Sequence, residues 1–215
     1  MGIIYKISRA IIEPYENLAA TAFREQYYNE TGIILMVNNP QYKEGISDPS
    51  EKYIPASGNQ FGGIIDEKGN LCNVLSDDKA NAFQHAYLGA YIAFEKGTEA
   101  VEAFGLLKEF GTFLFLNDQD WGDHNRDFKN NNIGIQIANS IKQNGGTLDN
   151  LNLQMFNTVM TGGLVSTKDT TDLCDEVKDL MNPLARNKLL SKLLDSLEYP
   201  YCLSLETARN NNLTF

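Results

Sequence analysis

The sequence predicts a mainly α-helical fold, a compact helical domain with a small β-hairpin near residues 61–75. Two patterns support this: apolar and small residues recur at helical spacing over several segments, and FGGIIDEKGNLCNVL carries two short apolar runs on either side of Glu67–Lys68–Gly69–Asn70. A length of 215 residues, with 42% apolar and 21% charged residues, suits one ordinary domain. We therefore expect a single domain over 1–215, in which helices from 149–197 pack on a core at 77–143.

The first part of the chain is expected to hold one helix and one long loop. Leu18, Ala19, Ala22 and Phe23 stand at helical spacing, which predicts an amphipathic helix over 15–28. Residues 38–60 are rich in Asn, Pro, Gly and Ser, which indicates a loop; a loop of this length often contributes to function.

Helices are expected to dominate after the hairpin. Ser76 or Asp77 can cap a helix that runs to about residue 95. A polar loop is predicted over 117–127, and Gly145–Gly146 should end the helix that follows it. The expected helices are 77–95, 98–110, 126–143, 149–160, 169–181 and 184–197. The alternative for the third is a loop over 126–132 and a helix start at Ile133.

The net charge of −10 excludes some classes of partner. Proteins that track nucleic-acid phosphates or anionic membranes depend on Lys and Arg, so neither activity is expected. A negative field favours a basic protein partner, for example an immunity-type protein. The N-terminal segment is interrupted by Lys6, Arg9 and Glu13, and no apolar run is long enough to span a membrane. We expect cytoplasmic synthesis, with export independent of a signal peptide left open.

The cysteines give no metal or disulfide pattern. Cys72, Cys174 and Cys202 are widely spaced and no CxxC pair occurs, so we expect three buried free thiols. A Cys72–His85 nucleophile pair is a further alternative, but no helix start is predicted that would activate the thiol.

Two helical faces carry the polar residues of most interest. Asp78, Asn81 and His85 share one face of the helix at 77–95, and histidine is the side chain best suited to proton transfer near neutral pH. Asp127, Asn130 or Asn131, and Gly134 share a face of the next long helix. Asparagine runs and glycine destabilise helices, which indicates a polar site or a tight packing requirement at this point.

The acidic loop between these helices is a second candidate site. Its oxygen-rich spacing could suit a divalent cation, although the EF-hand pattern fails, and His124 could join His85 on a transition metal. The alternative is a solvated acidic loop, so the cofactor is either none or a divalent cation. The candidate metal ligands are Asp118, Asp120, Asp123 and His124.

The order of these motifs resembles a bacterial domain of unknown function, found in secreted proteins and at the ends of polymorphic toxins. Its pattern reads NAxRHA, HE and DxxNNxxG, and the likeness covers about 60 of the 215 residues. Gln84 and Lys108 replace the Arg and the His of that pattern. The resemblance implies catalytic positions at His85, Glu109, Asp127 and Asn131, with substrate contacts from Asn81, Gln84 and Asn130.

Two functions remain open from the sequence. The first is a helical hydrolase, or toxin-effector-like enzyme, that acts on cell-envelope glycan or lipid by general acid/base or metal-assisted hydrolysis. The second is a noncatalytic interaction module, or degenerate relative, in which the same side chains form a structural polar network.

Overall fold

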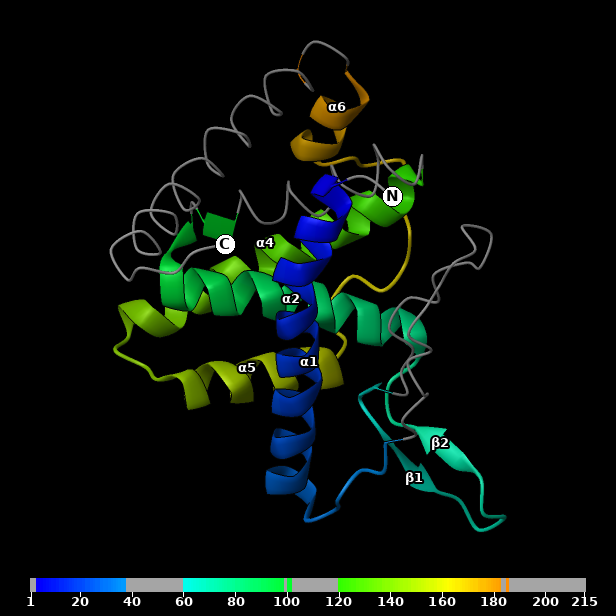
Figure 1. Cartoon of the computed structure of the whole chain (residues 1–215). Helices are drawn as coiled ribbons and strands as arrows, with labels where there is room; N and C mark the ends of the chain where they lie inside the picture. Colours follow the sequence, from blue (N-terminus) through cyan, green and yellow to red (C-terminus); the bar gives the residue numbers. More distant parts are fainter. Residues whose placement is uncertain (1–2, 38–59, 99, 102–119, 183–184, 186–215) are drawn as a thin grey trace, which may run out of the picture.

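The computed structural model describes residues 3–37, 60–98, 100–101, 120–182 and 185 (Figure 1). These residues form a mainly helical fold with one small antiparallel hairpin, as the sequence predicts. The elements are α1 Ile3–Thr31, β1 Gly63–Ile65, β2 Leu71–Asn73, α2 Asp77–Lys96, α4 Trp121–Gln143, α5 Leu148–Met160 and α6 Asp175–Met181. Most of three predicted segments, the loop over 38–60 and the helices over 98–110 and 184–197, lies outside the described residues, as does Cys202.

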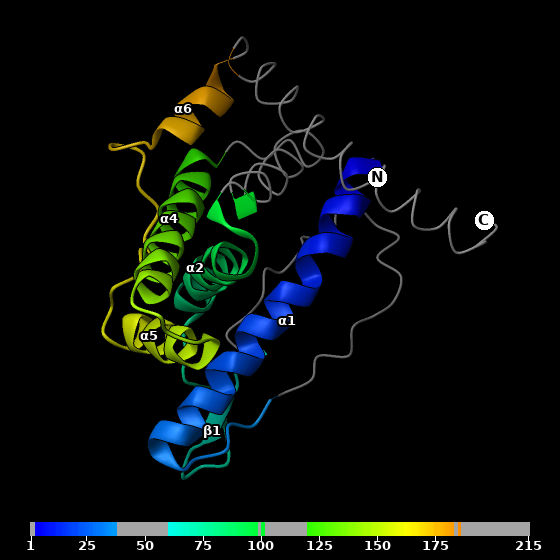
Figure 2. The same ribbon diagram turned by 90° about the vertical axis from the view of Figure 1, so that its left-hand side faces the viewer.

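Helix α2 lies at the centre of the arrangement. Figures 1 and 2 show α1 crossing one side of α2, while α4 runs along another side and α5 lies below α2 and α4. Twelve of its residues are buried, including every position from Ala82 to Ala90. A helix that is buried nearly all round serves as the support on which other elements pack.

Helices α2 and α4 run parallel to each other. Their contacts rise together in residue number, from Asn81 with Arg126, through His85 with Asp127, to Phe94 with Lys142. The N-termini of both helices therefore lie at the same end of the pair. That end carries Asp77 and Asp78 on α2 and Asp123 on α4, which suits the positive ends of two helix dipoles.

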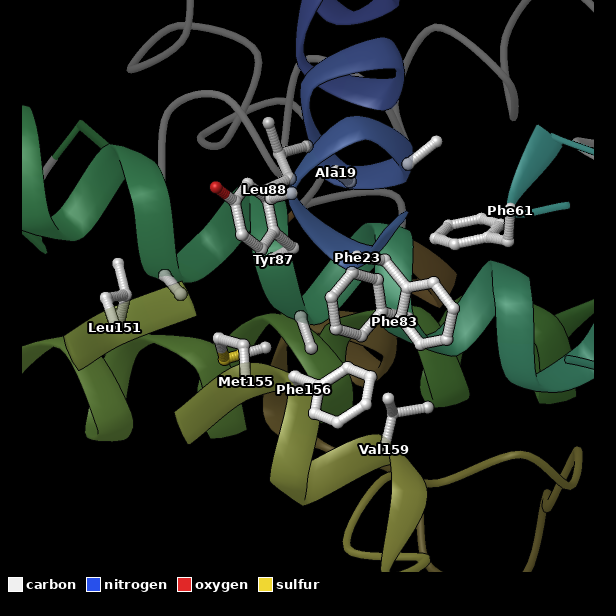
Figure 3. Packing of buried hydrophobic residues seen from close by; sticks show 14 of the residues in the cluster. Ala19, Phe23, Phe61, Phe83, Tyr87, Leu88, Leu151, Met155, Phe156 and Val159 are labelled. Carbon is white, nitrogen blue, oxygen red and sulfur yellow. The ribbon is translucent and has the colours of Figure 1, made fainter. Parts of the chain in front are cut away.

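Aromatic side chains join α1, α2 and α5 into one core (Figure 3). The Phe23 ring of α1 packs against Phe61, Phe83 and Phe156, with ring centroids between 5.4 and 5.6 Å apart. Tyr87 stacks on Phe83, and burial raises the pKa of its phenol. The aromatic part of the core thus lies on the α1 and α5 side of α2, while on the α4 side the apolar contribution of Ala138 lies beside polar contacts.

Three predicted boundaries were wrong. Helix α1 extends from Ile3 to Thr31 instead of 15–28. Helix α4 begins at Trp121, so most of the predicted polar loop over 117–127 is helical, and the alternative start at Ile133 is also wrong. Helix α6 begins only at Asp175, because the Asn125 side chain donates hydrogen bonds to the carbonyls of Asp169 and Asp172 and holds that stretch as turns.

Of the remaining local predictions, some were confirmed and one was wrong. The hairpin has Ile64 opposite Cys72, and α4 ends just before Gly145, as predicted. The prediction of buried cysteines was wrong for Cys72, which is exposed on the short strand β2, and for Cys174, which is only half-buried. No described helix combines the length and apolar character needed to cross a lipid bilayer.

Candidate functional site

A histidine and a carboxylate meet between α2 and α4. The Nε2 atom of His85 lies 2.9 Å from Oδ2 of Asp127. Both residues are almost completely buried, with 2% of His85 and 4% of Asp127 exposed. An ionised carboxylate only accepts hydrogen bonds, so the imidazole carries its proton on Nε2 and, when neutral, its lone pair on Nδ1. This arrangement fixes the orientation of the imidazole.

The second oxygen of Asp127 is held by its chain neighbour. Arg126 donates from Nε and from one terminal nitrogen to Oδ1 of Asp127, both at 3.1 Å. The same terminal nitrogen donates to Oδ1 of Asn81 on α2 at 3.0 Å. The guanidinium therefore fixes the carboxylate and links it across the two helices, and it is itself buried.

Further charges extend this cluster toward the start of α4. Asp123 pairs with Arg126 and, at 3.3 Å, with Lys168. Burial and the charge of Asp127 raise the pKa of Asp123, against the opposing effects of Arg126 and Lys168. The ammonium of Lys168 lies 2.6 Å from Asp120, and this hydrogen bond lowers the pKa of the Asp120 carboxyl.

Two glycines allow the helices to approach closely enough for these contacts. A Cβ atom built on Gly134 would lie 1.9 Å from the carbonyl oxygen of Ala86, and one on Gly89 would lie 2.6 Å from that of Asn131. No side chain fits at either position without separating the helices. The helix-destabilising Gly134 is thus explained by tight packing, one of the two reasons that the sequence suggests.

The predicted site residues do not all converge. Asn131 lies one turn beyond Asp127 on α4 and is buried, and its Oδ1 has no hydrogen-bond partner among the described residues. Asn81 joins the cluster through Arg126. Gln84 instead donates to Gln60, and Asn130 exchanges two hydrogen bonds with the backbone of Val165. The last two are therefore engaged away from His85.

The acidic segment over 117–127 was predicted as a loop, but its described part from Trp121 onward is helical. Asp120 caps α4, Asp123 and His124 lie in its first turn, and His124 is buried beside the ring of Trp121. Within the described ranges, no three His, Cys, Asp or Glu side chains gather in a way that could hold a metal ion. Glu109 and Asp118 lie outside the described residues.

Sequence reasoning missed Arg126. The sequence nevertheless holds a signal for it, because Arg126 follows Asp123 by three positions and directly precedes Asp127. Such spacing favours ion pairs within a helix. The prediction of a loop over 117–127 hid this signal, because only a helix places Asp123 and Arg126 on one face.

Comparison with known proteins gives no function for this cluster. No family model, curated protein or solved structure matches the chain. The site must therefore be interpreted from its own residues.

Proposed function

We propose that this protein is a hydrolase acting on cell-envelope material, either glycan or lipid, and that His85 is its general acid/base. The observation that carries the proposal is the buried His85–Asp127 pair, whose carboxylate is fixed by Arg126. Enzymes use a carboxylate in this way to set the tautomer of a catalytic histidine and to stabilise its protonated form.

The proposal assigns a role to each residue. Asp127 accepts a hydrogen bond from the Nε2–H of His85, and His85 is proposed to take a proton from water or substrate at Nδ1 and to return it to the leaving group. Asn131 is proposed to orient substrate or water, because its buried side-chain oxygen has hydrogen-bonding capacity unused by the described residues. Glu109 remains the proposed second acid/base group on the basis of its sequence alone.

The proposal extends to the biological setting. A toxin-effector-like enzyme of this kind is kept inactive in its producing cell by a dedicated partner. The net charge of −10 favours a basic, immunity-type protein in that role.

The test uses purified peptidoglycan sacculi and phospholipid vesicles as substrates. Wild-type protein should release soluble glycan fragments or fatty acid, measured by chromatography. His85→Gln and Asp127→Asn should each reduce the rate by about 10²-fold or more, the usual contribution of general acid/base catalysis. Gln136→Ala, an exposed change on α4, should leave the rate unchanged while circular dichroism shows all variants folded.

Two outcomes would contradict the proposal. One is release of neither product by the wild-type protein. The other is full activity in both the His85→Gln and the Asp127→Asn variants.

A second candidate is a noncatalytic module in which the same residues form a structural polar network. The low exposure of His85 and Asp127 favours it, as does the direct link from Arg126 to Asn81 on the neighbouring helix. Buried polar groups that satisfy one another can specify how two helices pack. This candidate predicts that Asp127→Asn lowers thermal stability by several degrees, whereas the enzyme hypothesis also requires a loss of turnover at temperatures where the variant is folded.

A further inference from the structure

The buried guanidinium of Arg126 contacts several carboxylates near His85. Only 3% of Arg126 is exposed, and it contacts Asp127, Asp123 and, at 3.8 Å, Asp78. Of these acids, Asp127 is the most deeply buried and the one that contacts His85. Arg126 can therefore set how strongly the negative charge of Asp127 attracts a proton to the His85 imidazole.

The surroundings contain more acids than bases. The charged side chains linked to the His85–Asp127 pair through the described contacts are Asp78, Asp120, Asp123, Arg126 and Lys168. Lys168 lies 2.6 Å from Asp120 and 3.3 Å from Asp123, so these two acids share its single positive charge. Arg126, in contrast, contacts Asp127 directly.

A buried carboxylate needs a compensating positive charge, because desolvation of an unpaired charge is costly. With Arg126 in place, Asp127 has that charge at 3.1 Å. Without it, the nearest group in the described network that can become positive is His85, which lies 2.9 Å from the other carboxylate oxygen. Loss of the guanidinium should thus favour the protonated imidazole.

We infer that Arg126 is a positioning residue that keeps His85 in its neutral, proton-accepting form by neutralising Asp127. A protonated His85 cannot act as a general base, so Arg126 would determine whether the site is competent near neutral pH. The catalytic meaning rests on the proposed function. The charge relation between Arg126 and His85 does not, and it can be measured without any substrate.

The experiment is an NMR titration of the imidazole C–H signals in the full-length protein. The chain has two histidines, so comparison with His124→Gln assigns the signals of His85. In Arg126→Gln, the midpoint of the His85 titration should rise by about one pH unit or more, the effect expected when an opposite charge is left to act alone. Arg126→Lys retains the charge and should restore most of the wild-type midpoint.

Two further variants make the test specific. Asp172→Asn removes an exposed carboxylate that pairs with Lys129, and it should leave the His85 midpoint unchanged. Asp123→Asn removes an acid that shares the guanidinium, so it should lower the midpoint. This second variant decides the question if Arg126→Gln fails to fold.

The inference is overturned if Arg126→Gln is folded and its His85 midpoint is unchanged or lower, or if Asp123→Asn leaves that midpoint unchanged or raises it. A purely structural role for Arg126 would change stability without moving the titration. If the midpoint moves as expected but no substrate is hydrolysed, the proposed function fails while this inference stands. If hydrolysis depends on His85 but the midpoint does not move, the proposed function stands and this inference fails.

Discussion

The three consecutive asparagines of α4 have three different environments. Asn130 is buried and bonds to Val165, Asn131 is buried beside Gly89, and Asn132 is exposed. Each step along a helix turns the side chain by about 100°, so neighbours in sequence face different surroundings. The three residues therefore do not form one polar site. Asn130 binds the backbone at Val165, Asn131 contacts α2, and Asn132 lies on the surface.

Asn130→Asp should destabilise the protein because the new carboxylate cannot donate to the Val165 carbonyl. The Asn130 amide now donates to that oxygen at 2.8 Å and accepts from the Val165 N–H at 3.0 Å. We expect a loss of about 2 kcal/mol in the free energy of unfolding at pH 7, measured with urea. The introduced carboxyl should have a raised pKa in the folded state, so the loss should shrink as the pH falls toward 4.

Asn132→Asp is the matched control for this change. It introduces the same charge two residues away at an exposed position, and it should change the free energy of unfolding by less than about 0.5 kcal/mol. Equal effects from the two variants would show that the bonds to Val165 contribute nothing.

At the scale of elements, the start of α4 is fixed by its cap. The Asp120 carboxylate accepts a hydrogen bond from the backbone N–H of Asp123 at 3.0 Å and also pairs with Lys168. Asp120→Ala should therefore cost about 1 kcal/mol of stability, as loss of an N-cap usually does. Asp120→Asn retains a capping oxygen and should cost less.

The pH dependence separates the charge of Asp120 from its cap. Because the pKa of Asp120 is lowered in the folded protein, its charge stabilises the fold above the ordinary carboxyl range, and this contribution is lost as the pH falls through the lowered pKa. The stability gap between wild type and Asp120→Asn should thus close in acid, measured by urea unfolding from pH 7 to pH 2.5. A gap that stays constant with pH would contradict the role of the ion pair.

Gly134→Ala tests the close packing of α2 and α4. Alanine is the better helix former by about 1 kcal/mol, so a surface glycine would gain stability from this change. Here the new methyl group would overlap the Ala86 carbonyl, and we expect a net loss of about 3 kcal/mol or more. The readout is thermal unfolding, and a variant as stable as the wild type would show that the helices can separate freely.

The existence of the long helices could be predicted from sequence, but some of their boundaries could not. The small residues of α2 and the glycines after α4 carry local signals, and these predictions were confirmed. The start of α4 was missed because Trp-Gly-Asp-His resembles a loop when read locally. Its helical form depends on the Asp120 cap and on burial of His124 and Asn125, which are properties of the folded chain.

At the scale of the whole molecule, Phe23 connects four segments that are distant in sequence. Its ring contacts Tyr27 on its own helix and Phe61, Phe83 and Phe156 from other parts of the chain. Phe23→Ala should lower the free energy of unfolding by about 3–5 kcal/mol, the usual cost for a buried phenylalanine. Tyr28→Ala, at an exposed position on the same helix, should have a small effect in the same denaturant titration.

A loss below about 1 kcal/mol in Phe23→Ala would mean that α1 is not part of the cooperative core. Separate unfolding transitions for different spectroscopic probes would lead to the same conclusion.

The candidate site shows what sequence can and cannot predict at this scale. The His85 and Asp127 positions followed from helical periodicity and from the resemblance to a known pattern, and the structure brings them together. The roles of Gln84 and Asn130 could not be predicted, because their partners Gln60 and Val165 are 24 and 35 residues away. Which partner a polar side chain meets depends on the tertiary arrangement.

The parallel course of α2 and α4 has a consequence for the order of folding. Two helices joined by a short turn form an antiparallel pair, whereas here the C-terminal end of α2 and the start of α4 lie at opposite ends of the pair. The Arg126–Asn81 bond therefore closes a loop of 45 residues. Because contacts at such separation form slowly, the His85–Asp127 pair should assemble only when the chain reaches its native topology, and a fragment containing α2 alone would lack it.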